Sequence, residues 1–395
     1  MPEKETGKMR TAFRARGTTA WRNLLAVGES SKEEKEEVAE AKDELKNTLL
    51  ASLQMQHLVV LAGCGCSQSA GGPSMLDLWN FAVGEKPTVK ATEIAARVNH
   101  DLADKNIEAF LSRVEAFLQV KEDTAVRSFL DSSKQVILDN CTAFLDPAKL
   151  GAHKTFLHRL SRRRVRDQRL RVFTTNYDLC FERAASDLGG VALDGFSFIA
   201  PRRYDPRFFG YDIIRRLRSG DDLGNYLEGV FLLYKLHGSV NWARGEAGAI
   251  YEKPKPTPAE ACLIYPASGK YQQSFVQPHL ESMAQYLAAV REPNTCVLVV
   301  GFGFNDDHLA EPLLAAVQSN PHLRLIIVDR SADDKAKGSH ASRFWNDFSQ
   351  LGERGEDVWF IKAPFEDFAQ LIPDLKSLTP ADTLMKAIKR VTKEP

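Results

Sequence analysis

The sequence predicts an α/β fold: a doubly wound, mostly parallel, Rossmann-like sheet with a helical lobe formed by insertions. Apolar runs of strand length alternate with helix-like segments along most of the 395 residues, and this alternation is typical of a parallel sheet. Near-continuous runs such as residues 230–236 indicate central strands, which helices cover on both faces. Several runs end directly in glycines or short polar side chains, and open sheets bind ligands at such strand ends.

The expected elements follow one another along the chain. We predict strands at these apolar runs: residues 58–62, 170–174, 230–236, 296–300, 323–329 and 358–362. In residues 106–120 the apolar positions recur at helical spacing, which predicts a core-facing helix. Further helices are expected at residues 126–145, from about 179, at 307–318 and at 366–371. Residues 195–229 and 243–273 have no clear period, so we interpret them as an insertion and a long loop.

The two ends of the chain lie outside this core. Residues 9–25 place four large apolar side chains among arginines, which predicts a short amphipathic helix that docks on the main domain or on another subunit. Residues 30–46 combine Glu and Lys at three- and four-residue spacing, as a solvated helix does. We therefore expect these domains: an N-terminal helical extension (1–49), a main domain (50–373) with helical insertions at about 91–150 and 195–229, and a C-terminal tail (374–395).

Composition excludes several kinds of protein. Lysine plus arginine equals aspartate plus glutamate, at 52 each, so bulk charge gives no reason to expect binding to nucleic acid or to an anionic membrane. The arginine-dense residues 159–171 form the one local basic stretch. None of the six cysteines falls in a Cys-X-X-Cys pair, so we expect no zinc site. Because we find no signal-peptide core and no apolar run near the ~20 residues that span a bilayer, we expect a soluble, cytoplasmic protein.

Four strand ends carry the motifs of chemical interest. In chain order they read Gly-Cys-Gly-Cys-Ser at 63–67, Thr-Thr-Asn-Tyr-Asp at 174–178, Leu-His-Gly-Ser at 236–239 and Gly-Phe-Gly-Phe-Asn-Asp at 301–306. Glycines let backbone amides approach a phosphate, and the next helix adds its positive amino end. Purely structural roles are the alternative: Asn176 and Asp178 could cap a helix, and His237 could be a core histidine. We interpret His308, in the first turn of a predicted helix, as structural.

As an ordered set, these motifs resemble the sirtuin superfamily, and specifically its bacterial sirtuin-like branch of NAD-consuming antiphage enzymes. The resemblance extends over about residues 50–373 and implies that NAD lies across the carboxyl ends of the strands. It implies that Asn176 orients the ribose and water, Asp178 recognises nicotinamide and His237 is the general base. The residues it implies for binding NAD are Gly63, Gly65, Ser67, Thr175, Gly301, Gly303 and Asp329. A carboxylate at a strand end, such as Asp329, can accept hydrogen bonds from ribose hydroxyls.

The resemblance also implies a reaction and partners. Deacylases of the superfamily carry a zinc ribbon of two Cys-X-X-Cys pairs, and the lack of these pairs disfavours protein deacylation here. Water then remains as the nucleophile, which gives an NAD hydrolase that depletes NAD in abortive infection; the alternative is a non-catalytic subunit that senses NAD or ADP-ribose. We expect a homo-oligomer beside a separate HerA-type ATPase or other defence subunit, because only about twenty residues follow residue 373. Residues 159–171 and 9–25 are the expected contact surfaces, with a solvated basic helix and a frayed terminus as alternatives.

Overall fold

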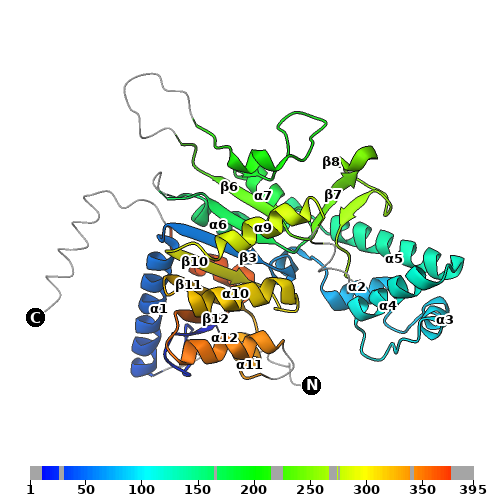
Figure 1. Ribbon diagram of the computed structural model, residues 1–395. Coiled ribbons are helices and arrows are strands. Elements are labelled where there is room, and N and C mark those ends of the chain that lie inside the picture. The colour runs from blue at the N-terminus through cyan, green and yellow to red at the C-terminus, as the bar shows by residue number, and fades with distance from the viewer. Residues whose placement is uncertain are drawn as a thin grey trace, which may run out of the picture.

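The computed structural model describes residues 11–25, 31–163, 167–214, 226–266, 274, 276–338 and 342–374. Its main strands are β1 (Ala12–Arg14), β2 (Arg22–Asn23), β3 (His57–Ala62), β4 (Leu170–Thr174), β5 (Val191–Leu193), β6 (Val230–Lys235), β10 (Thr295–Val300), β11 (Leu323–Asp329) and β12 (Val358–Lys362). They form one 9-stranded sheet in the order β2-β1-β12-β11-β10-β3-β4-β6-β5 (Figure 1). Neighbours from β12 to β5 are parallel, and β1 and β2 add an antiparallel edge. The predicted fold class is therefore confirmed.

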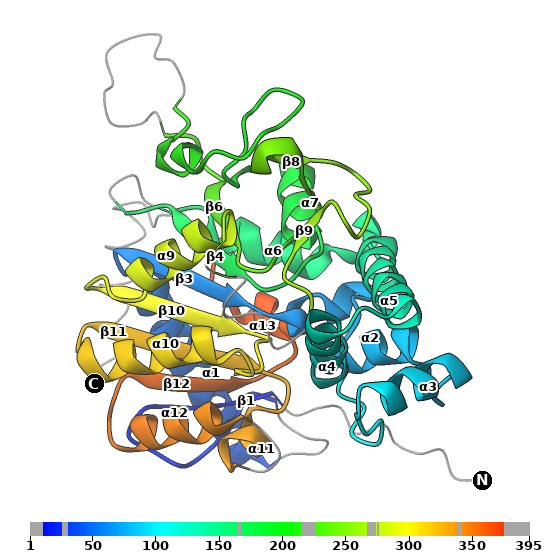
Figure 2. The same ribbon diagram turned by 45° about the vertical axis from the view of Figure 1, so that its right-hand side comes forward.

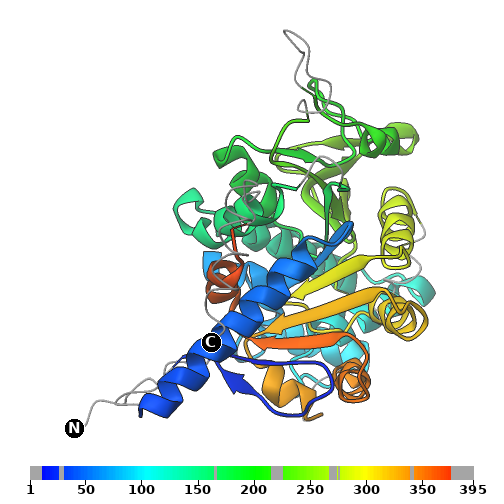
Figure 3. The ribbon, with the colours of Figure 1, turned by 90° about the vertical axis from the view of Figure 1, so that its left-hand side faces the viewer.

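Helices cover both faces of the sheet, as Figure 3 shows. The first layer consists of α1 (Lys32–Leu53), α6 (Gly151–Leu160), α7 (Cys180–Asp187) and α13 (Phe365–Leu371). The second consists of α9 (His279–Ala289), α10 (Asp307–Ser319), α11 (Ala332–Ala336) and α12 (Arg343–Glu353). In β3, Val60 packs with the first layer and Val59 with the second. This two-sided burial explains why the six predicted strands are continuous apolar runs, and each lies within one residue of its predicted bounds.

A helical lobe lies beside the carboxyl ends of the parallel strands (Figure 2). It contains α2 (Met75–Ala82), α3 (Val89–Arg97), α4 (Ile107–Val120) and α5 (Thr124–Ala143). The lobe has its own core, in which the ring of Phe110 lies 6.0 Å from Trp79 and 5.5 Å from Phe129. The two predicted helices of this region, α4 and α5, are thus confirmed. The lobe forms one side of the cavity at the strand ends.

The helix predicted at residues 9–25 is wrong for the part that the structure describes, residues 11–25. There the chain forms β1 and β2, and residues 9 and 10 lie outside the described ranges. Phe13 of β1 is fully buried, pairs with Ile361 of β12 and stacks on Trp359 at 6.3 Å. Burial against a strand almost 350 residues away overrides the local pattern. The acidic helix is also less solvated than expected, because α1 continues to Leu53 and buries one apolar stripe.

The loop predicted at residues 243–273 is also partly wrong. Its described part contributes to a 3-stranded antiparallel sheet of β7 (Gly238–Arg244), β8 (Ile250–Glu252) and β9 (Ala261–Leu263). Trp242 of β7 packs on Phe196 at 5.3 Å in a small core of its own. Residues 267–273, residues 215–225 of the 195–229 insertion and the tail from 375 lie outside the described ranges. Within the described ranges, no helix combines the length and apolar character needed to cross a bilayer.

The arginine-dense residues 159–171 are largely used inside the fold. Arg159 donates to Ala369 O (3.0 Å), Gln370 O (2.7 Å) and Ile372 O at the end of α13. Arg163 donates to Leu53 O (2.9 Å), Gln56 O (3.1 Å) and Gln168 O (2.7 Å), and so caps the end of α1. Two more arginines of this stretch form ion pairs, Arg169 with Asp212 and Arg171 with Glu292. Arg162 has no hydrogen-bond partner among the described residues, and residues 164–166 lie outside them.

We predict that Arg163→Ala lowers the free energy of unfolding by about 1–3 kcal/mol, because the carbonyls after the last turn of α1 lose their charged donor. Arg162→Ala is the matched control and should change it by less than about 0.5 kcal/mol. Urea unfolding followed by circular dichroism measures both variants. Equal effects of the two substitutions would contradict the capping role.

Candidate active site

A cavity lined by the described residues lies where the strand order of the sheet reverses. From β3 the chain continues through β4, β5 and β6 on one side and then returns to β10 on the other. Open α/β sheets bind ligands at this switch point, at the carboxyl ends of the strands. The cavity has a volume of about 620 Å³, within the roughly 300–1,000 Å³ of small-molecule sites. Its walls come from the loops after β3, β4, β6 and β10 and from the helical lobe.

The floor of the cavity depends on a contact between two glycine turns. A Cβ atom on Gly65 would lie 2.7 Å from Gly301 Cα, and one on Gly63 would lie 2.6 Å from Gly301 O. Gly301 also has φ of +59°, a conformation that favours glycine. These three glycines, all predicted to bind NAD, are therefore required first for packing. Gly303 differs, because a Cβ there would meet only the side chain of Asn305, at 3.1 Å.

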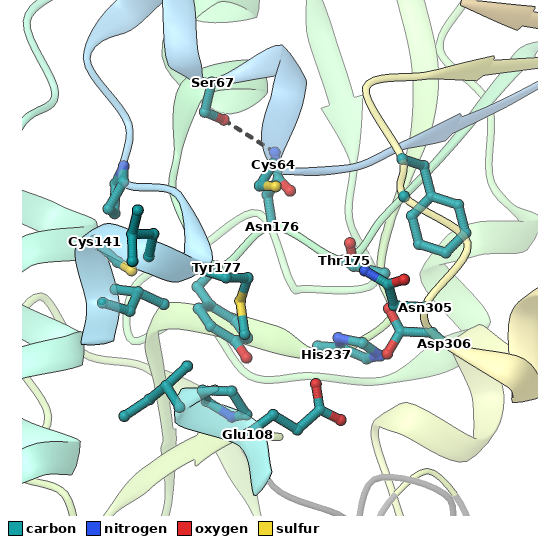
Figure 4. Close-up of a pocket in the computed structure, with 18 of the residues that line it drawn as sticks. Cys64, Ser67, Glu108, Cys141, Thr175, Asn176, Tyr177, His237, Asn305 and Asp306 are labelled. Atoms are coloured by element: carbon teal, nitrogen blue, oxygen red, sulfur yellow. Dashed lines mark hydrogen bonds between the residues drawn. The ribbon is translucent and has the colours of Figure 1, made fainter. Parts of the chain in front are cut away.

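The turn after β10 holds a bulky residue in the left-handed region. Phe304 has φ of +57° and is fully buried, with its ring 5.2 Å from Trp345 and 5.1 Å from Phe348. Such a conformation costs about 1–3 kcal/mol, so the surrounding rings must maintain it. The turn brings Asn305 and Asp306 to the cavity wall (Figure 4). They come five and six residues after Val300, the last residue of β10, and their place in a loop after a strand end is the signal for them in the sequence.

Asn176 is fixed by its amide group. Its Nδ2 donates to Gly63 O (3.0 Å) and to Ser67 Oγ (2.9 Å), and the side chain is buried. Because both amide hydrogens are used, the orientation of the amide is determined. No described residue donates to Asn176 Oδ1, so this oxygen is available to accept from a ligand or water. Asn176 therefore lines the cavity and does not cap α7.

Ser67 and Asp178 form the next link of the same buried network. Ser67 Oγ donates to Asp178 Oδ2 at 2.7 Å, so its hydroxyl hydrogen is used within the protein. Asp178 Oδ1 accepts from Cys180 N at 2.9 Å, at the start of α7. Asp178 thus has both roles that the sequence suggested. It accepts a hydrogen bond from the first amide of the following helix, and it lines the cavity. Thr175, which lies between Thr174 and Asn176 in the chain, also lines the cavity.

A buried lysine, missed by sequence reasoning, supports this turn from behind. Lys235 ends β6, is 2% exposed, and donates through Nζ to Asp178 O. It also forms an ion pair with Glu182 Oε1 at 3.3 Å. Burial raises the pKa of the Glu182 carboxyl and the Lys235 ammonium acts in the opposite direction. The only signal in the sequence is a lysine inside an otherwise apolar strand.

His237 reaches the cavity from the end of β6 and is 3% exposed. Figure 4 labels it among the lining residues, together with Asp306. Its Nε2 lies 3.5 Å from Nε2 of His308. The interpretation of His308 as merely structural is therefore incomplete, because the structure places it against the candidate base. Glu108 of α4, within a helix predicted as core-facing, also lines the cavity.

Some predicted residues lie outside the cavity lining: Gly63, Gly65, Gly301 and Asp329. The three glycines form the turns beneath the cavity, whereas the Asp329 carboxylate accepts from Ser331 N (2.8 Å) and Lys335 Nζ (2.7 Å) at the end of β11. Cys64 does line the cavity. Among the described residues there is no group of three or more His, Cys, Asp or Glu side chains that could hold a metal ion.

Comparison with known proteins shows similarity to Sir2-type proteins. None of the curated proteins matches this sequence. A Sir2 homologue in complex with NAD superposes with a TM-score of 0.42 at 13% identity, covering 87% of this chain and 94% of its own. A mutant Sir2 homologue with ADP-ribose gives 0.42 at 13% identity, covering 89% and 98%. The model of the SIR2-like domain matches residues 170–349, from β4 to α12.

Proposed function

We propose that this chain hydrolyses NAD to ADP-ribose and nicotinamide. The observation that carries the proposal is the cavity at the switch point, where Asn176, Asp178 and His237 from two strand ends line one space. These are the side chains that the resemblance to sirtuin-like NAD hydrolases assigns to catalysis. A purely NAD-sensing subunit has no need of a buried, oriented asparagine together with a histidine.

The chemistry follows from the side chains. The bond from ribose C1′ to nicotinamide breaks, and its electron pair goes to the ring nitrogen of nicotinamide. Water forms the new bond to C1′, and one of its protons passes to His237 and then to solvent. Asn176 Oδ1 accepts from this water or from a ribose hydroxyl, while Asp178 uses the remaining lone pairs of its carboxylate for the nicotinamide amide.

In the cell, we propose that the chain acts in bacterial defence against phage, as a homo-oligomer beside a separate HerA-type ATPase. This proposal rests on the resemblance of the ordered motifs to that branch of sirtuin-like enzymes. The internal pairing of Arg159, Arg163, Arg169 and Arg171 leaves Arg162 as the described arginine of this stretch that is open to a partner.

His237→Ala and Asn176→Ala should each lower NAD turnover by about a hundredfold or more, because the general base or the oriented amide is lost. Release of nicotinamide from NAD, measured by chromatography with and without the ATPase, checks this prediction. His322→Ala, at an exposed histidine, is the control and should retain full turnover. Folded variants at positions 237 and 176 that turn over NAD normally would refute the assignment. Binding of NAD with no turnover by the unmodified protein would favour the sensing alternative.

Metal analysis of the purified protein should find no stoichiometric zinc. The reason is the spacing of the six cysteines, none of which forms a Cys-X-X-Cys pair. Atomic emission spectroscopy after dialysis measures the zinc content. One zinc per chain would contradict this expectation and reopen protein deacylation.

Light scattering at micromolar concentration should show an oligomer, and co-expression should retain a HerA-type ATPase on the tagged chain. Arg162→Glu should weaken this complex, because it reverses an unpaired charge on the expected contact stretch. Glu33→Lys, a charge reversal on the exposed side of α1, is the control. A strictly monomeric chain that retains no ATPase would count against the assembly.

A further inference from the structure

The second histidine beside the candidate base lies behind it, not in the cavity. His237 lines the cavity, whereas His308 is absent from its lining. Their Nε2 atoms are 3.5 Å apart and their rings are stacked, with centroids 5.6 Å apart and an angle of 30°. His308 is 8% exposed, so bulk water has little access to the pair. The contact is thus built into the fold between the end of β6 and the start of α10.

Proton transfer to His237 determines which histidine of the pair donates the hydrogen bond and which accepts it. When His237 takes a proton from water, both of its ring nitrogens carry hydrogen. Its Nε2 is then a donor that faces His308 Nε2. The contact is favourable only if His308 is neutral and presents a lone pair at that atom, with its own hydrogen on Nδ1.

A neutral His308 suits the place of this residue in its helix. It is the second residue of α10, where the positive end of the helix disfavours a second cation. Asp306, the N-cap residue of α10, lines the cavity together with His237, and Figure 4 labels both. A carboxylate in the same cavity favours a positive charge on His237.

We infer that His308 is a positioning residue that accepts a hydrogen bond from protonated His237 and so stabilises the charged base. This inference rests on the proposed NAD hydrolysis, in which His237 receives the proton from water. His308 itself touches neither substrate nor the reacting atoms, because it lies outside the cavity lining.

The test compares two substitutions of His308. Phenylalanine keeps the ring and its stacking but accepts no hydrogen bond, whereas glutamine brings an amide oxygen close to the position of Nε2. His308→Phe should lower kcat about 10- to 100-fold and change KM less than about twofold, while His308→Gln retains most of kcat. In a His237→Ala background, His308→Phe should cost nothing further. His153→Phe, at a buried histidine packed against the rings of Phe181 and Phe365, is the control and should leave kcat unchanged.

A second readout needs no turnover. The titration of His237, followed by nitrogen-15 NMR and assigned from its loss in His237→Ala, should give a pKa about one unit lower in His308→Phe than in the unmodified protein or in His308→Gln, because the acceptor favours the charged form. The other titratable groups around the pair stay constant across these variants: Glu108, Tyr177, Asp178, His279, Asp306 and Asp307.

The outcomes separate this inference from the proposed function. Loss of turnover in His237→Ala but normal kcat in His308→Phe would overturn the inference and leave NAD hydrolysis standing. Equal losses in His308→Phe and His308→Gln would also overturn it, because packing alone would then be responsible. If the unmodified protein hydrolyses no NAD, the proposed function fails. The titration then tests the inference by itself, and an unchanged or raised pKa of His237 in His308→Phe overturns it.

Discussion

The approach of two backbones, at Gly65 and Gly301, is the contact on which the site depends. It forms at the ends of adjacent parallel strands, β3 and β10, and leaves no room for a Cβ atom on either side. The turn that it fixes presents Gly63 O and Ser67 Oγ to Asn176, and Ser67 passes the constraint to Asp178. The close packing of two main chains thereby determines the positions of the Asn176 carboxamide and the Asp178 carboxylate.

Much of the fold could be predicted because the central strands are buried on both faces and therefore appear as unbroken apolar runs. The edge could not. β1 and β2 are too short to show any period, and β1 is a strand only because β12 offers it a partner. The small sheet could not be predicted for the same reason, since β8 and β9 are short, a proline-rich segment separates them, and each becomes a strand by pairing with β7.

The site was partly predictable for a related reason. Asn176, Asp178 and His237 come directly after β4 and β6, which are neighbours in the sheet, so the rule that ligands bind at strand ends brings them together. Asp329 ends β11, which is separated from β3 by β10, and its carboxylate is held by Lys335 instead. Lys235 and His308 could not be assigned, because their partners depend on how elements pack and not on the order of residues at a strand end.

The pairing of β1 with β12 has a consequence for how the chain reaches this structure. Residues 12–14 are synthesised almost 350 residues before their partner strand, residues 358–362. The apolar ring of Phe13 must therefore remain without its final neighbour while the residues between the two strands are made. Contacts of such sequence separation form slowly, and an unpaired apolar segment is prone to aggregation in the meantime. Closure of the sheet is thus a late event in the life of the nascent chain.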